Sequence, residues 1–331
     1  MERFALAAAV VLGFALTAAL CSLFVPLRRV LERREQNQQP AQSEQPRPAP
    51  LRAPLWGGLC AAAGTVAAVG VGWLAACVGQ PELLGSEGRL MTRLLTALAG
   101  SLAFGAVGLA EDLARMRSPA ALGLRRDVRL LLEALAAAFV LLLLQAAGCL
   151  PRGLDVPGAG YVLLGSAVPF LWAVLMVALA ECARIAERDE GTVCGAAFVA
   201  MLALMMAEAG LGVPGLAVLP AALAGALVAL LLWAFPPARL GVGCCGSLLA
   251  AGAIGCIPLS LDMTSLTVPL ALPFWAAGGL WAAQLLGAKR TGKPLRCWVK
   301  KHKMSPETVF LCSFALSAVG YVLALALLRW C

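Results

Sequence analysis

The sequence predicts an all-α, polytopic integral membrane protein with about ten transmembrane helices. Of its 331 residues, 61% are hydrophobic and only 13% are charged, and the mean hydropathy is +0.86. A soluble chain of this length carries far more charge to cover its surface. Apolar stretches long enough to cross a bilayer recur along the chain. They are rich in Ala, Leu and Gly and do not alternate in polarity, which favours helices over a membrane barrel.

Ten apolar stretches define the predicted spans, and together they form a single membrane domain over residues 1–331. Short polar connections, most of which contain Arg, Lys, Pro or Gly, separate them. The predicted spans are residues 4–26, 55–79, 91–110, 130–149, 161–183, 192–209, 213–235, 243–260, 264–286 and 307–329.

Basic residues predict the orientation of these spans. Five alternate connections (27–54, 111–129, 184–191, 236–242 and 287–306) hold 6, 5, 2, 1 and 7 Lys and Arg residues, which is 21 of the 26 in the chain. Because basic loops stay in the cytoplasm, these five face inward and both termini lie outside. The stretch 27–54 has the composition of a flexible linker, and 287–306 is a basic cytoplasmic loop.

The net charge of +8 and the cysteines exclude two other classes. The basic residues lie in loops without interleaved aromatic residues, so nucleic-acid binding is not expected. The twelve cysteines form no CxxC pair, and His302 is the single histidine. The sequence therefore predicts no zinc or iron–sulfur site, and most of the cysteines act as small apolar residues.

Acidic and basic residues gather at the inner end of the third span. Glu111 and Asp112 are adjacent, and Arg115 follows one turn later. Arg129 immediately precedes the fourth span, and Glu133 lies about one turn inside it. Two acids beside a base can hold a cation or orient a phosphate. A solvated helix end is the alternative interpretation of the same pattern.

Five motifs in order resemble the phospho-N-acetylmuramoyl-pentapeptide transferases and the wider family of polyprenyl-phosphate phosphosugar transferases. They are Ala53-Pro-Leu-Trp-Gly-Gly58, Gly108-Leu-Ala-Glu-Asp-Leu-Ala-Arg115 with Gly123-Leu124, Glu181-Cys-Ala-Arg-Ile-Ala-Glu-Arg-Asp-Glu-Gly191, Pro236-Pro-Ala-Arg-Leu-Gly-Val-Gly-Cys-Cys-Gly-Ser-Leu248 and Pro294-Leu-Arg-Cys-Trp298. The resemblance runs along the whole chain. It implies ten helices with both termini outside, in a bacterial plasma membrane.

The resemblance also implies a reaction and a site. Members of the family use Mg²⁺ to bring a UDP-sugar together with polyprenyl phosphate, making lipid intermediates of the cell wall. Membrane lipids surround such a protein, and its relatives often form homodimers. The family's catalytic positions match Glu111 and Asp112. Its substrate-binding positions match Arg115, Arg129, Glu187, Glu190, Gly246 and Ser247.

Several of the family's functional positions carry other residues here. The magnesium-binding aspartate falls on Cys244, whose soft thiolate suits zinc or copper(I) better than Mg²⁺. Two asparagines become Glu181 and Arg184, and a histidine cluster becomes Arg296-Cys-Trp298. No metal ligand is therefore assigned, and Mg²⁺ binding is expected to be weakened.

Three functions remain open at this point. The first is a divergent transferase with impaired or lost magnesium-dependent activity. The second is a non-catalytic protein that binds polyprenyl phosphate or acts as a cell-wall scaffold. The third is a transporter or flippase, supported only by the multi-span architecture and the intramembrane Glu133.

Overall fold

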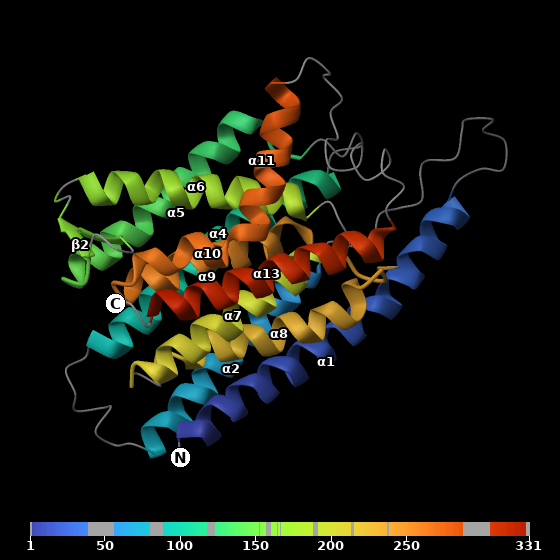
Figure 1. Cartoon of the computed structure of the whole chain (residues 1–331). Helices are drawn as coiled ribbons and strands as arrows, with labels where there is room; N and C mark the ends of the chain where they lie inside the picture. The colour runs from blue at the N-terminus through green and yellow to red at the C-terminus, as the bar shows by residue number, and fades with distance from the viewer. Residues whose placement is uncertain are drawn as a thin grey trace.

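The apolar stretches form long helices in the computed structural model (Figure 1). The structure describes residues 2–38, 56–79, 89–117, 123–151, 153–156, 160–163, 165, 167–187, 191–212, 215–236, 238–286 and 305–328. The long helices are α1 (Glu2–Gln38), α2 (Gly57–Gly79), α4 (Arg89–Arg117), α5 (Arg126–Ala146), α6 (Ala167–Ala186), α7 (Thr192–Gly210), α8 (Val218–Ala234), α9 (Gly243–Ser260), α11 (Leu272–Leu286) and α13 (Pro306–Leu328). The short elements are strands β1 (Gly153–Val156) and β2 (Gly160–Leu163), the 3-10 turn η1 (Thr264–Leu266) and helix α10 (Thr267–Leu270).

Each of the ten predicted spans contains a helix, which confirms the helical class. By length and composition, seven helices in the described part of the chain are candidate membrane spans: α1, α2, α4, α6, α7, α9 and α13. Residues 264–270 and 272–283 form an eighth candidate if the pair, bent by 63°, is a single span. Helix α8 is apolar but shorter. A polytopic helical membrane protein is thus established, while ten crossings and the placement of the termini stay predictions.

Helix α9 lies at the centre of the bundle. All of its residues are buried, whereas α13 buries only 17% of its most apolar window. Its sequence is rich in Gly, Ala and Cys, and small residues allow neighbouring helices to approach closely. In Figure 1, α1 (blue) lies along one edge of the bundle, and α13 (red) crosses the near face. The polar groups at the start of α9 are therefore enclosed by other helices.

Glycines set the contact between α9 and its neighbours α4 and α2. A side chain on Gly108 of α4 would collide with the backbone of Cys244 and Cys245, and one on Gly58 of α2 would collide with the backbone of Gly246. Helix α2 is further held by hydrogen bonds from Gly57 N–H to the Gly241 carbonyl (3.2 Å) and from Gly58 N–H to the Val242 carbonyl (2.9 Å). These bonds satisfy two donors that a helix N-terminus leaves free.

Two boundaries differ from the sequence prediction. The predicted span 161–183 is wrong at its start, because residues 160–163 pair with 153–156 in an antiparallel hairpin and α6 begins at Ala167. Gly153 lies beside the Tyr161 ring with no room for a Cβ, a local signal that a hydropathy window does not detect. The predicted linker 27–54 starts too early, because α1 continues to Gln38. Residues 39–54, and 287–304 of the basic loop, lie outside the described residues.

Candidate functional site

The candidate site is built where α4 meets the first turn of α9. Gly243 has a φ of +73°, a left-handed conformation that glycine adopts without a steric penalty. The chain then enters α9, and the N–H groups of Cys244 and Cys245 donate to the two carboxylate oxygens of Asp112 at 3.0 and 2.9 Å. Asp112 is 1% exposed. Its charge is stabilised by these N–H groups and by the positive end of the α9 dipole.

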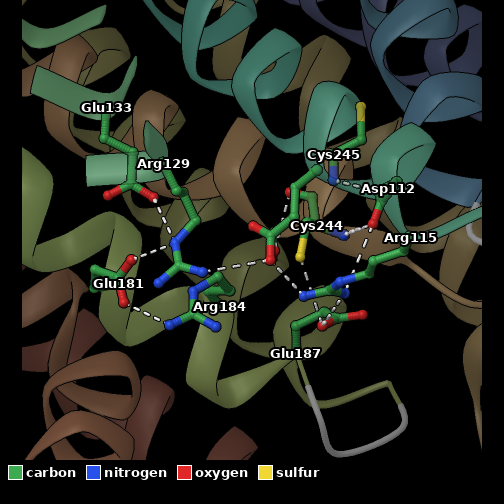
Figure 2. Close-up of polar contacts among 11 residues, drawn as sticks. Asp112, Arg115, Arg129, Glu133, Glu181, Arg184, Glu187, Cys244 and Cys245 are labelled. Carbon is green, nitrogen blue, oxygen red and sulfur yellow. Dashed lines mark hydrogen bonds and ion pairs between the residues drawn. The ribbon is translucent and has the colours of Figure 1, made fainter. Parts of the chain in front are cut away.

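Arg115 connects Asp112 to two further acids (Figure 2). Its guanidinium lies 2.6 Å from Glu111 Oε1, 3.8 Å from Asp112 Oδ1 and 4.0 Å from Glu187 Oε2. The Glu111 and Asp112 contacts follow from helical spacing, since one turn separates Arg115 from each. Glu187 comes from the turn after α6, so Arg115 links α4 to α6.

Arg129 of α5 forms the second centre of the site. Its Nε donates to Glu181 Oε1 at 2.8 Å and lies 3.9 Å from Glu133 Oε1, and its Nη1 lies 3.6 Å from Glu111 Oε1. Arg184 binds the other oxygen of Glu181 at 2.5 Å. Figure 2 shows the guanidinium of Arg129 between Glu133 and Glu181. Helices α4, α5 and α6 are thereby joined through buried charges.

The Cys244 thiol lies among these acids. Cys244 is fully buried, and its Sγ is 4.0 Å from Glu187 Oε2. Figure 2 shows the Cys244 sulfur pointing toward Glu187, beside the Arg115 guanidinium. The position that the resemblance assigns to a magnesium-binding aspartate therefore lies inside the charged cluster and carries no oxygen.

Among the residues that the structure describes, the side chains of this cluster do not fit a magnesium ion. Mg²⁺ requires oxygen ligands in near-octahedral geometry. Each of the carboxylates of Glu111, Asp112, Glu133, Glu181 and Glu187 already lies within 4.0 Å of a guanidinium, and Asp112 uses both oxygens to accept N–H groups. Among the described residues, no group of three or more His, Cys, Asp or Glu side chains is arranged to hold a metal ion. The arginines supply positive charge but offer no electron pairs.

The structure brings together five of the eight predicted site residues: Glu111, Asp112, Arg115, Arg129 and Glu187. Glu190 lies outside the described residues. Gly246 packs against Gly58, and the buried hydroxyl of Ser247 donates to the Cys244 carbonyl at 3.1 Å. In this structure both of these residues contribute to packing at the start of α9, and their binding roles stay predictions.

Sequence reasoning named Glu133, Glu181 and Arg184 but did not assign them to the site. Glu181 and Arg184 are three residues apart, and Arg129 and Glu133 are four apart, so each pair shares a helix face. This spacing was available in the sequence. The pairing of Arg129 with Glu181 joins two different helices, and spacing within the sequence does not indicate it.

Comparison with known proteins agrees with this architecture. The model of the family described as glycosyl transferase family 4 matches residues 94–262, more than half of the chain. A phospho-N-acetylmuramoyl-pentapeptide-transferase of Mycobacterium bovis (strain BCG / Pasteur 1173P2) is 28% identical over 265 residues, which cover 72% of each chain. That of Desulforudis audaxviator is 32% identical over 170 residues, covering 48% of this chain and 50% of the relative.

A third relative, the phospho-N-acetylmuramoyl-pentapeptide-transferase of Synechococcus sp. (strain RCC307), is 30% identical over 212 residues and is covered over 55% of its length. The match to this protein and to the Desulforudis protein thus spans about half of each relative. The family model covers α4 to α9, the segment that carries every residue of the charged cluster. The chain belongs to glycosyl transferase family 4.

Proposed function

We propose that this chain is a phosphosugar-transferase-like protein of the bacterial plasma membrane in which magnesium-dependent transfer is impaired or lost. The three relatives carry the name phospho-N-acetylmuramoyl-pentapeptide-transferase, which suggests a UDP-sugar and polyprenyl phosphate as ligands. The observation that carries the proposal is that each of the site's five described carboxylates lies within 4.0 Å of an arginine, and that Asp112 uses both oxygens to accept backbone N–H groups.

The physical argument concerns the cation that a phosphoryl transfer requires. Mg²⁺ neutralises charge on both phosphates and orients them for attack. Here three arginines, Arg115, Arg129 and Arg184, are fixed on helices and form ion pairs with the acids of the site. A metal would have to displace a guanidinium from a buried ion pair, and breaking such a pair costs about 3–5 kcal/mol.

Binding without turnover is the role that this arrangement supports. Arginine side chains recognise phosphate through several N–H donors and need no metal for that. We propose that the chain retains a lipid-phosphate or nucleotide ligand at the cytoplasmic end of α4, α5 and α6. The proposal uses the predicted orientation, in which the basic connections lie in the cytoplasm and both termini lie outside.

A reconstituted assay tests the proposal. The purified protein is incubated with Mg²⁺, UDP-N-acetylmuramoyl-pentapeptide and undecaprenyl phosphate, and released UMP is measured beside the Mycobacterium relative under identical conditions. The proposal predicts release at least 10³-fold below that of the relative, corresponding to about 4 kcal/mol of lost transition-state stabilisation. Release within tenfold of the relative contradicts it.

A binding measurement distinguishes a non-catalytic protein that binds polyprenyl phosphate from a scaffold that binds no ligand. Labelled undecaprenyl phosphate is titrated into the protein in detergent without divalent ions. Saturable binding that Arg115→Ala weakens supports a phosphate-binding role. The exposed Arg125, whose side chain is 85% exposed, provides the matched control as Arg125→Ala. Absence of saturable binding contradicts retention of the lipid phosphate and favours the scaffold alternative.

A further inference from the structure

Helices α1 and α2 pack against each other in a regular antiparallel register. Gly72 faces Ala9, Gly64 faces Thr17, and the ring of Trp56 stacks on that of Phe24 with centroids 5.7 Å apart. The contact at Gly64 is the tightest of these, because a Cβ there would collide with the Thr17 hydroxyl. The two helix backbones are therefore unusually close in this region.

Two cysteines occupy the next layer of the same interface. One turn beyond Thr17 is Cys21, and one turn before Gly64 is Cys60. The register that pairs Thr17 with Gly64 therefore places Cys21 opposite Cys60. Both are free thiols, and they are 0% and 1% exposed. Two cysteines that face each other across closely packed helices meet the first requirement for a disulfide, which is proximity without movement of the backbone.

We propose that Cys21 and Cys60 form a reversible disulfide that joins α1 to α2, with an apolar hydroperoxide as the oxidant. The site is buried in apolar surroundings, so a lipid hydroperoxide reaches it more readily than a charged oxidant. One sulfur attacks the peroxide O–O bond, which gives a sulfenic acid and releases an alcohol. The second thiol then displaces water as the S–S bond forms. Two thiols are thus oxidised while the peroxide is reduced, and a cellular thiol restores both cysteines.

The bond has a consequence for the start of α9. Cys60 is one turn from Gly57 and Gly58, whose N–H groups hold the carbonyls of Gly241 and Val242. A disulfide at Cys60 therefore fixes the N-terminal end of α2, and with it the connection that leads into Cys244. This inference is independent of the proposed function, since it rests on the α1–α2 interface alone.

The experiment exploits the cysteine content of the N-terminal segment. Cys21 is the single cysteine in residues 1–59. A protease recognition sequence is inserted into the full chain within residues 39–55, and the protein in detergent is treated with cumene hydroperoxide. Free thiols are then blocked with N-ethylmaleimide, the chain is cleaved, and the fragments are separated with and without reductant.

The expected result is that the N-terminal fragment stays attached to the remainder without reductant and separates with it. Attachment is lost in Cys21→Ser and in Cys60→Ser, and it persists in Cys149→Ser, a matched control at a cysteine outside this interface. Cys194→Ser and Cys245→Ser test two other buried thiols of the bundle. Both variants are expected to keep the attachment.

Two results overturn the proposal. One is complete separation of the fragments from oxidised, folded protein without reductant. The other is attachment that survives Cys60→Ser, which assigns the bond to another partner. Alanine variants at both positions, compared by elution volume in detergent, guard against misfolding of the serine variants.

Discussion

Asp112 accepts the backbone N–H of Cys244 at 3.0 Å, and this bond ties α4 to the first turn of α9. The same carboxylate accepts the N–H of Cys245 at 2.9 Å. Asp112 therefore uses both of its carboxylate oxygens to bind backbone N–H groups of α9. Cys244, which comes from a different motif, has a thiol where the resemblance places an oxygen ligand.

The first prediction concerns Asp112→Asn. An amide offers one acceptor oxygen where the carboxylate offers two, so one of the two N–H groups loses its partner in a buried position. The expected loss in the free energy of unfolding is about 2 kcal/mol, measured by denaturation in detergent. Asp127→Asn is the matched control, because its side chain is 86% exposed, and it should change stability by less than about 0.5 kcal/mol. Equal effects of the two variants contradict the assignment.

The second prediction concerns Arg129→Met. Among the described residues, Arg129 provides the ion pair of Glu133, which is 0% exposed. Removing the guanidinium leaves this carboxylate buried without compensation, and the expected cost is about 3–5 kcal/mol. Adding Glu133→Gln to the same chain should recover part of the loss in a double-mutant cycle. A cycle with additive effects contradicts the pairing.

The third prediction compares two glycines of α2. Gly58→Ala places a methyl group on the backbone of Gly246, and the expected cost is about 3 kcal/mol, because backbone cannot move aside as a side chain can. Gly70→Ala meets nothing within 4 Å and should stabilise the helix by up to about 1 kcal/mol. Thermal unfolding of the two variants in the same detergent measures the difference. A Gly58→Ala protein as stable as Gly70→Ala disproves the close approach of α2 and α9.

The fourth prediction concerns Cys244→Asp. The new carboxylate lies close to Glu187, since the thiol that it replaces is 4.0 Å from Glu187 Oε2. Two like charges in a buried site repel, so the variant should be less stable than Cys244→Ser by about 1–3 kcal/mol. Mg²⁺ should reduce that difference by binding between the oxygens. Unfolding curves with and without Mg²⁺ provide the measurement, and a difference that Mg²⁺ leaves unchanged means that the arginines still exclude the ion.

Hydropathy predicted the helices of the bundle well, because a span of about twenty apolar residues has few alternatives in a membrane. It did not predict the hairpin at 153–163, which is short and depends on cross-strand pairing. The extension of α1 to Gln38 was also missed, since charged residues there suggested a linker. A hydropathy window does not detect a helix that continues beyond its apolar segment.

The site was predicted in part for a similar reason. Glu111, Asp112 and Arg115 share one helix turn and were identified from spacing. Arg129 and Glu187 were identified through the resemblance, and the structure places both beside that turn. The contact of Arg129 with Glu181 depends on how α5 packs on α6, which spacing within one helix cannot specify.

The most direct test of the account is a titration of the purified native protein with Mn²⁺ in place of Mg²⁺, in the presence of UMP, followed by electron paramagnetic resonance of the free ion. Because the carboxylates of the site are paired with arginines and position 244 carries sulfur, the account predicts no stoichiometric Mn²⁺ binding. One equivalent of Mn²⁺ bound by the native chain, displaced by Mg²⁺ and lost in Glu187→Gln, would contradict it.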